Sequence, residues 1–160
     1  MEFKRLESVL SVYGEKVKET YRGYLDSEGV NASRSLSDTI SVNLDVSGNI
    51  YEVSLLLKEY WKWIEGGRPP THNDGNGELR RSILKWIRVK PVIPRPFNGK
   101  LPTEKQLAYL ISRKIHMYGY SGKGLLKKSL DDNERFIEDI ENAMVEDVME
   151  NIDKIIILYK

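Results

Sequence analysis

The chain has 160 residues, a formal net charge of +1 and 40% apolar residues, which indicates one soluble globular domain over residues 1–160. It contains no cysteine, so a disulfide framework, a thiol nucleophile and a cysteine-ligated metal are excluded. No apolar stretch has the length of a signal-peptide core or of a membrane span. We therefore expect a protein that is made and used in the cytosol and has no membrane partner.

The first segment, residues 1–28, is predicted to be an amphipathic helix. Its apolar residues recur every three or four positions from Phe3 to Leu25, which places them on one helix face. Gly14 weakens this helix by up to about 1 kcal/mol relative to alanine, and Gly29 is a stop signal. The apolar face should cover a sheet.

Residues 40–57 give the clearest strand signal. Apolar and polar residues alternate on both sides of Gly48-Asn49, which has the composition of a two-residue turn. Such a turn pairs apolar residues with one another: Val46 with Tyr51, Leu44 with Val53, Val42 with Leu55 and Ile40 with Leu57. It also sets Asp45 opposite Glu52 on the solvent face. One apolar face predicts an α+β fold in which an antiparallel, hairpin-based sheet packs against several amphipathic helices.

An aromatic stretch follows and ends in Gly-Gly-Arg-Pro-Pro, so a helix cannot continue through it. We interpret this stretch as a buried structural corner made of Tyr60, Trp61, Trp63, Glu65, Gly67, Arg68, Pro69 and Pro70. Trp86, on the next predicted helix, should pack back against it. Stacking of nucleic-acid bases on the aromatic side chains is the alternative, but their apolar spacing favours core packing.

Residues 78–118 are predicted to form two helices joined by a proline-rich loop. The first helix has its apolar residues on one face between Leu79 and Ile87, and Pro91 ends it. The second begins with the capping box Thr103-Glu104-Lys105-Gln106 and continues to Gly119. The glycines of residues 119–124 then indicate a flexible connection.

The last segment, residues 131–160, is predicted to be an acidic helix with a tail. The helix should start near Asp131, where Glu134 has capping-box spacing. Its core-facing side chains should be Phe136, Ile140, Met144, Val148 and Ile152. Residues 155–159 are apolar and indicate a short strand or a buried tail.

The charges nearly cancel in total but are segregated along the chain. The segment 80–128 has one acid, Glu104, among its basic residues Arg80, Arg81, Lys85, Arg88, Lys90, Arg95, Lys100, Lys105, Arg113, Lys114, Lys123, Lys127 and Lys128. The final segment is acidic, with Glu138, Glu141, Glu146 and Glu150 among its carboxylates. Three explanations stay open: neutralisation within one subunit, head-to-tail attraction between subunits, and a basic surface that faces DNA.

Signals for catalysis are weak. His72 and His116 are far apart and belong to no spaced metal motif, so a capping or surface role is favoured. Paired carboxylates such as Glu138/Asp139 fit the solvated face of an acidic helix. The glycine-rich residues 119–124 lack the preceding strand and the Gly-Lys-Ser/Thr ending of a phosphate loop. We expect no enzyme activity, no cofactor and no metal site.

Five motifs in fixed order give the chain a family resemblance. Asn31-Ala32-Ser33 and Leu36-Ser37-Asp38-Thr39-Ile40 precede the hairpin, and the Tyr60–Pro70 corner follows it. The two next predicted helices contain Ile83-Leu84-Lys85-Trp86-Ile87 and Leu107-Ala108-Tyr109-Leu110-Ile111-Ser112-Arg113-Lys114-Ile115. Over residues 30–128 this order resembles the tail-completion (neck) proteins of tailed bacteriophages and prophages. The corner, written Tyr-x-x-aromatic-x-Glu-x-Gly-x-x-Pro, is the most specific part, whereas the proline-rich insertion 91–102 departs from the shortest members.

The resemblance implies a non-enzymatic structural protein of the virion, assembled as a ring in the head–tail connector with other connector and tail proteins. DNA would pass nearby without specific binding. A ring needs two different complementary surfaces, so we expect Arg80, Arg81, Lys85, Arg88, Arg113 and Lys114 to meet Glu138, Glu141, Glu146 and Glu150 of a neighbour. The proline-rich loop and residues 119–124 would become ordered only on assembly. The alternative function is a nucleic-acid-binding accessory module that uses the basic segment 80–128.

Overall fold

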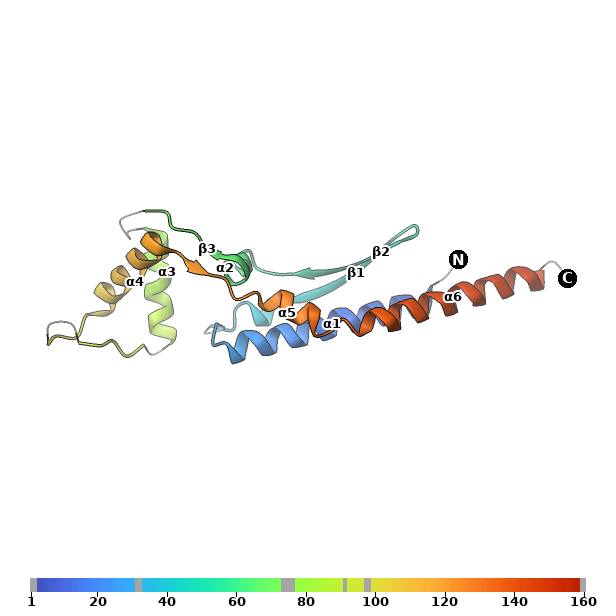
Figure 1. Cartoon of the computed structure of the whole chain (residues 1–160), viewed down its shortest axis with the longest axis horizontal. Helices are drawn as coiled ribbons and strands as arrows, with labels where there is room; N and C mark the ends of the chain where they lie inside the picture. Colours follow the sequence, from blue (N-terminus) through green and yellow to red (C-terminus); the bar gives the residue numbers. More distant parts are fainter. Residues whose placement is uncertain (1–2, 31–32, 73–76, 91, 97–98, 159–160) are drawn as a thin grey trace.

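The structure is a computed structural model that describes residues 3–30, 33–72, 77–90, 92–96 and 99–158. Asn31, Ala32, Pro91 and Tyr159, which enter the expectations above, lie outside these ranges. The described elements, in chain order, are α1 (Lys4–Ser27), a 3₁₀ turn (Ser37–Thr39), β1 (Ser41–Ser47), β2 (Ile50–Leu56), α2 (Trp61–Gly66), β3 (Gly67–Arg68), α3 (Glu78–Val89), α4 (Glu104–Tyr118), β4 (Tyr120–Ser121), α5 (Leu125–Asp131) and α6 (Phe136–Leu158). This is a single α+β domain, as predicted, and it is elongated (Figure 1).

The β1–β2 hairpin has the predicted register. Val46 pairs with Tyr51, and Asp45 faces Glu52. The ladder stops at Ser41 and Leu56, so the predicted pair of Ile40 and Leu57 falls just outside it. Helix α1 covers one face of this hairpin along its length, as its apolar stripe predicts (Figure 1).

The main core lies where α1 meets the start of the hairpin and α5. Its buried side chains are Tyr21, Leu25, Leu36, Ile40 and Leu125. Helix α6 then runs back beside α1 and projects beyond it, so that both ends of the chain lie at one end of the molecule (Figure 1). We call α1, β1, β2, α2, α5 and α6 the body.

Helices α3 and α4 pack on each other at the opposite end of the molecule and form what we call the lobe (Figure 1). The lobe has its own small core of Ile83, Ile87 and Ala108. The predicted capping box is confirmed, because the side chains of Thr103 and Gln106 each bond the backbone of the other residue. The antiparallel β3–β4 pair carries the chain between lobe and body.

The C-terminal segment differs from the prediction in three ways. A separate helix, α5, comes first, and α6 begins at Phe136 rather than near Asp131. The predicted core positions Met144 and Ile152 are 51% and 43% exposed. The chain from residue 155 to residue 158 is helical rather than a strand, and the Ile155 side chain is exposed.

The buried residues of α6 are Ala143, Asp147 and Asn151. Each of these positions precedes a residue of the predicted apolar stripe by one residue. The two polar ones satisfy hydrogen bonds, which a pattern of apolar residues does not reveal. Within the described ranges, no helix has both the length and the apolar character needed to cross a membrane.

Candidate functional site

The predicted structural corner is a short helix, α2, whose aromatic side chains divide between core and surface. Trp61 and Ile64 pack against the main core. The exposed fraction is 39% for Tyr60, 46% for Trp63 and 39% for Trp86. The expectation that all of these rings are buried is therefore wrong for three of them. The six-residue helix α2 turns Trp61 and Ile64, rather than Trp63, to the core, whereas Tyr60 precedes α2 and Trp86 lies on α3.

Gly67 ends α2 with φ +74° and ψ −165°, a conformation that only glycine adopts easily. A Cβ atom at Gly67 would lie 2.2 Å from the carbonyl oxygen of Tyr120. Gly122 faces the same contact from the other side, since its Cβ would lie 1.8 Å from the carbonyl oxygen of Glu65. The glycines of the corner and of residues 119–124 thus let two backbones cross in direct contact.

The glycine-rich residues 119–124 are therefore a packed crossing rather than the flexible connection predicted above. Tyr120 and Ser121 pair with β3, and the amide of Lys123 donates to the carbonyl of Ile64 at 2.7 Å. The carboxylate of Glu65 accepts a hydrogen bond from the amide of Leu126 at 2.8 Å, in the first turn of α5, where a negative charge stabilises a helix. This order is present within one chain, without assembly.

Beside this crossing, Tyr21 lies in the core with its hydroxyl buried and without a hydrogen-bond partner among the described residues. Burial, with the carboxylate of Glu65 nearby, raises the pKa of the Tyr21 phenol. The phenol is therefore neutral and serves packing, not acid–base chemistry.

His116 is buried at 3% exposure, so a surface role is wrong for this residue, whereas His72 is exposed. The His116 carbonyl accepts hydrogen bonds from the amides of Thr71 and His72 at 2.8 and 2.9 Å. Its Nδ1 bonds the hydroxyl of Thr71. Its Nε2 is buried and lacks a hydrogen-bond partner in the part of the chain that the structure describes.

The lobe carries the predicted basic surface. Arg81, Lys85, Arg88, Arg113 and Lys114 are exposed. Arg88 pairs with Glu104 at 3.0 Å, and this is the lobe's one ion pair among the described residues. Half-buried Arg80 lies over the ring of Tyr109, with 5.4 Å from Cζ to the ring centre.

Next to Arg80 the lobe has a groove of about 430 Å³. Its lining combines apolar and basic side chains: Arg80, Lys100, Leu101, Pro102, Gln106, Tyr109 and Leu110. Leu101 and Leu110 are 65% and 51% exposed. The groove therefore offers an apolar floor with positive charge at its edge.

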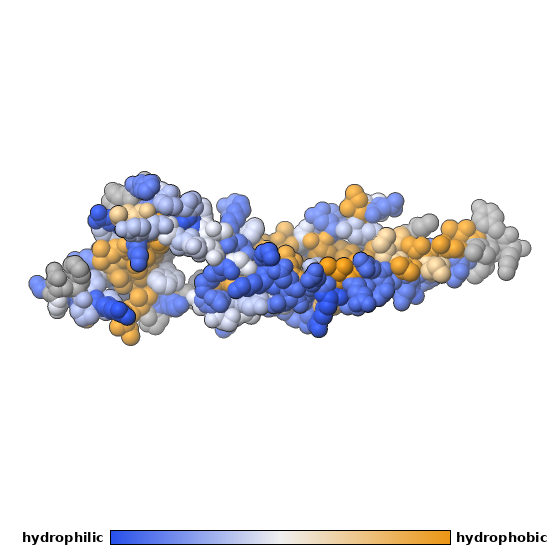
Figure 2. Space-filling view, viewed as in Figure 1, coloured by the Kyte–Doolittle hydropathy of each residue, from blue (hydrophilic) through white to orange (hydrophobic). Residues whose placement is uncertain are grey.

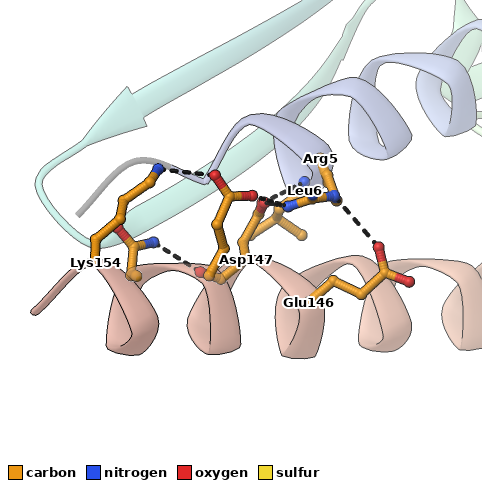
Figure 3. Close-up of polar contacts among 7 residues, drawn as sticks. Arg5, Leu6, Glu146, Asp147 and Lys154 are labelled. Carbon is orange, nitrogen blue, oxygen red and sulfur yellow. Dashed lines mark hydrogen bonds and ion pairs between the residues drawn. The ribbon is translucent and has the colours of Figure 1, made fainter. Parts of the chain in front are cut away.

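The predicted acidic partners lie on α6, which runs along the half of the molecule away from the lobe (Figure 1). Glu138 and Glu141 are near the start of α6, where Phe136 packs against Tyr13 of α1, rather than at its free end. Glu146 and Glu150 both pair with Arg5 of α1, and Figure 3 shows the contact of Arg5 with Glu146. Hydrogen bonds from Lys154 and then Arg5 lower the pKa of Glu150 from its ordinary value of 4.5 to about 2. Glu138 and Glu141 are exposed and have no ion pair with any described residue. Glu146 and Glu150 therefore form ion pairs within the chain, whereas Glu138 and Glu141 form none with a described residue.

Helix α6 also exposes a broad apolar face, which the sequence analysis assigned partly to the core. Figure 2 shows apolar surface along the free end of α6 and again over the lobe. The exposed side chains of α6, each between 43% and 61% exposed, are Ile137, Met144, Val145, Met149, Ile152 and Ile155. Glu138 and Glu141 lie between Ile137 and Met144 in the sequence, so the apolar face has acidic neighbours near the start of α6.

The structure thus keeps the basic lobe apart from the acidic helix α6, although Lys127, near the end of the basic segment, pairs with Asp131. No ion pair joins α3 or α4 to α6 within the described ranges, so neutralisation of the lobe by α6 in one subunit is not what the fold does. Comparison of the chain with protein-family models, with curated protein sequences and with solved structures finds no significant match. The resemblance to tail-completion proteins accordingly stays a prediction from the sequence motifs.

Proposed function

We propose that this chain is a structural protein of a tailed-phage virion, part of the connector ring that joins the DNA-filled head to the tail. The proposal starts from the motif order over residues 30–128. The observation that carries it furthest is the separation of two complementary surfaces to opposite halves of an elongated molecule (Figures 1 and 2). Such a molecule is suited to end-to-end contact with its own copies.

The two surfaces match in both polarity and charge. The free face of α6 is apolar with Glu138 and Glu141 beside it, and the lobe groove has an apolar floor with basic side chains around it. Contact between different surfaces on successive copies is heterologous, and it closes into a ring when the rotation between copies allows. We assign the α6 face of one subunit to the lobe groove of the next.

The ion pairs within the chain indicate which of the four acidic residues should contribute to the contact between copies. Glu146 and Glu150 already bond Arg5 in their own chain, so they have less to gain from a neighbour. Glu138 and Glu141 have no such partner in the described part of the chain. These two carboxylates should therefore contribute most to the charge attraction between copies.

A charge-exchange experiment tests the contact. The wild type should form an oligomer in native mass spectrometry, and the double variant Glu138→Lys/Glu141→Lys should fold normally but lose that oligomer. Asp45→Lys/Glu52→Lys makes the same change of net charge on the hairpin and should leave the oligomer intact. Mixing the first variant with Arg80→Glu/Lys100→Glu, which reverses the two basic side chains that line the groove, should restore association. Unchanged oligomers in the first variant would overturn the assigned contact.

Quantitative mass spectrometry of particles from the source phage or induced prophage tests the virion assignment itself. The protein should be present in a small fixed copy number, comparable with that of the portal protein. Absence from mature particles would overturn the assignment. This measurement is independent of the variants, so a wrong contact and a wrong function can be told apart.

One observation favours a second function, a nucleic-acid-binding accessory module. Arg81, Lys85, Arg113 and Lys114 are exposed on one lobe and make no ion pair with any described residue, so they are available to phosphates. Duplex DNA should then bind with an affinity that falls steeply as salt rises. A structural ring protein should show little of this binding.

A further inference from the structure

A second cavity lies at the crossing between body and lobe, away from the groove described above. It is a cleft of about 560 Å³, within the size range of small-ligand sites. It is lined by Tyr60, Trp63, Arg68, Glu78, Leu79, Ser82, His116 and Tyr120. These residues come from α2, β3, α3, α4 and β4, so the cleft exists only because the corner and the glycine-rich segment cross.

The walls of the cleft are aromatic and open to solvent. Tyr60, Trp63 and Tyr120 are each between 39% and 46% exposed. A ligand that covered these rings would remove apolar surface from water, which is favourable. The guanidinium of Arg68 lies over the ring of Trp63, with 5.5 Å from Cζ to the ring centre, and makes no ion pair with a described residue. An aromatic ring beside a cation suits a flat ring that carries negative charge.

The polar groups of the cleft include both donors and acceptors. His116 also lines the cleft; its Nε2 is buried and has no hydrogen-bond partner among the described residues, and this atom donates or accepts according to the proton on Nδ1, which bonds Thr71. Glu78 supplies an acceptor, and Ser82 supplies both kinds of group. The polar atoms that a ligand can reach directly are therefore those of Arg68, Glu78 and Ser82.

This set excludes simpler ligands. A small inorganic anion would bond Arg68 but would leave the aromatic walls and the hydroxyl of Ser82 without a partner. A purely apolar ligand would strip water from Arg68, Glu78 and Ser82 without replacing their hydrogen bonds. A nucleobase presents donors and acceptors on its edge and a flat face for stacking, and its phosphate provides the negative charge.

We infer that this cleft binds one unpaired nucleotide, with its base stacked on Trp63 and its phosphate bound by Arg68. The nucleotide belongs either to a free mononucleotide or to single-stranded nucleic acid. Duplex DNA does not fit, because its bases are already stacked and paired. The inference depends on neither the ring nor the basic surface of the lobe.

Binding measurements on the full chain at constant salt test this site. Titration calorimetry measures the binding of AMP and of adenosine. Fluorescence anisotropy measures the binding of a labelled short oligothymidylate and of a labelled duplex of the same length. Trp63→Leu should weaken oligothymidylate binding by roughly tenfold or more, the usual effect of losing one stacking ring. Trp86→Leu is the matched control, because Trp86 is similarly exposed but lies outside the cleft; it should bind as the wild type does.

The outcomes separate the sources of the nucleotide. AMP binding as tight as oligothymidylate binding assigns a mononucleotide, and much tighter oligothymidylate binding assigns single-stranded nucleic acid. Arg68→Gln should abolish the preference for AMP over adenosine, because it removes the phosphate partner. The inference is overturned if neither AMP nor oligothymidylate binds, if Trp63→Leu and Trp86→Leu behave alike, or if Trp63→Leu weakens duplex binding as much as single-strand binding.

Discussion

The backbone amide of Leu6 donates a hydrogen bond to Oδ2 of Asp147 at 3.0 Å (Figure 3). Leu6 lies in the first turn of α1, whose N-cap residue Phe3 has no side-chain acceptor. The other oxygen of the same carboxylate accepts from Nη1 of Arg5, also at 3.0 Å. A carboxylate of the last helix therefore does the work of an N-cap for the first helix and fixes the two together.

Replacing Asp147 by alanine should lower the free energy of unfolding by about 2 kcal/mol, because the buried Leu6 amide is left without an acceptor. Urea unfolding of the two proteins measures the difference. Glu146→Ala is the matched control on the same helix: its carboxylate also pairs with Arg5 but is exposed, and exposed pairs contribute little. Equal losses in the two variants would contradict the capping role.

The position of Asp147 shows what apolar periodicity misses in the sequence. The spacing correctly predicted a long helix in this region, but its inward face was assigned to Met144 and Ile152, which are exposed. Helix α6 turns Asp147 inward because the unsatisfied amides of α1 need an acceptor. That need arises from another segment of the chain, so no local pattern of α6 contains it.

Helix α1 has two glycines whose replacement should have opposite effects. A Cβ at Gly14 would lie 2.5 Å from Cγ1 of Val42 and 2.9 Å from Cγ1 of Val53, so Gly14→Ala should push the hairpin away. We expect a net loss of about 1–2 kcal/mol in stability, because overpacking outweighs the gain in helix propensity.

Gly23→Ala is the control for that loss. A Cβ at Gly23 meets nothing within 4 Å, so this variant should gain up to about 1 kcal/mol from helix propensity alone. Thermal unfolding of both variants measures the two signs. A stabilising Gly14→Ala change would show that the hairpin does not rest on α1 at this point.

The hairpin, the capping box and α1 could be predicted because each depends on residues close in sequence. The β3–β4 crossing could not, since the whole α3–α4 lobe separates Gly67 from Gly122 in the sequence. The sequence signal was present in both glycine-rich stretches, but it was interpreted as flexibility for the second. Exposure of Trp63 was missed for a related reason: a wall of the cleft exists only once β4 lies beside α2.

Gly67→Ala should be strongly destabilising, by more than about 3 kcal/mol. Alanine at this position must adopt a backbone conformation reserved for glycine, and its Cβ collides with the Tyr120 carbonyl, which is backbone and cannot rotate away. Gly66→Ala, one residue earlier, meets nothing within 4 Å and should be neutral or stabilising. Chemical denaturation of both proteins compares them; similar stabilities would mean that the crossing is loose.

The last prediction concerns pH. The pKa of Glu150 falls from 4.5 to about 2 in the folded chain through hydrogen bonds from Lys154 and Arg5. The folded state therefore holds this carboxylate ionised where the unfolded state binds a proton, so its stabilising contribution is complete above about pH 4.5 and disappears as pH falls towards 2. Wild type should have a higher thermal midpoint than Glu150→Gln at neutral pH, and the gap should close over that acidic range.

Glu141→Gln controls for the loss of one negative charge on the same helix, because Glu141 has no ion pair with a described residue, and it should change the midpoint little. Added salt should also narrow the gap between wild type and Glu150→Gln, since exposed charges are screened. A gap that stays constant from neutral to acidic pH would mean that Glu150 stabilises the helix by packing rather than by charge. The charged contact of Arg5 with α6 would then depend on Asp147 and Glu146.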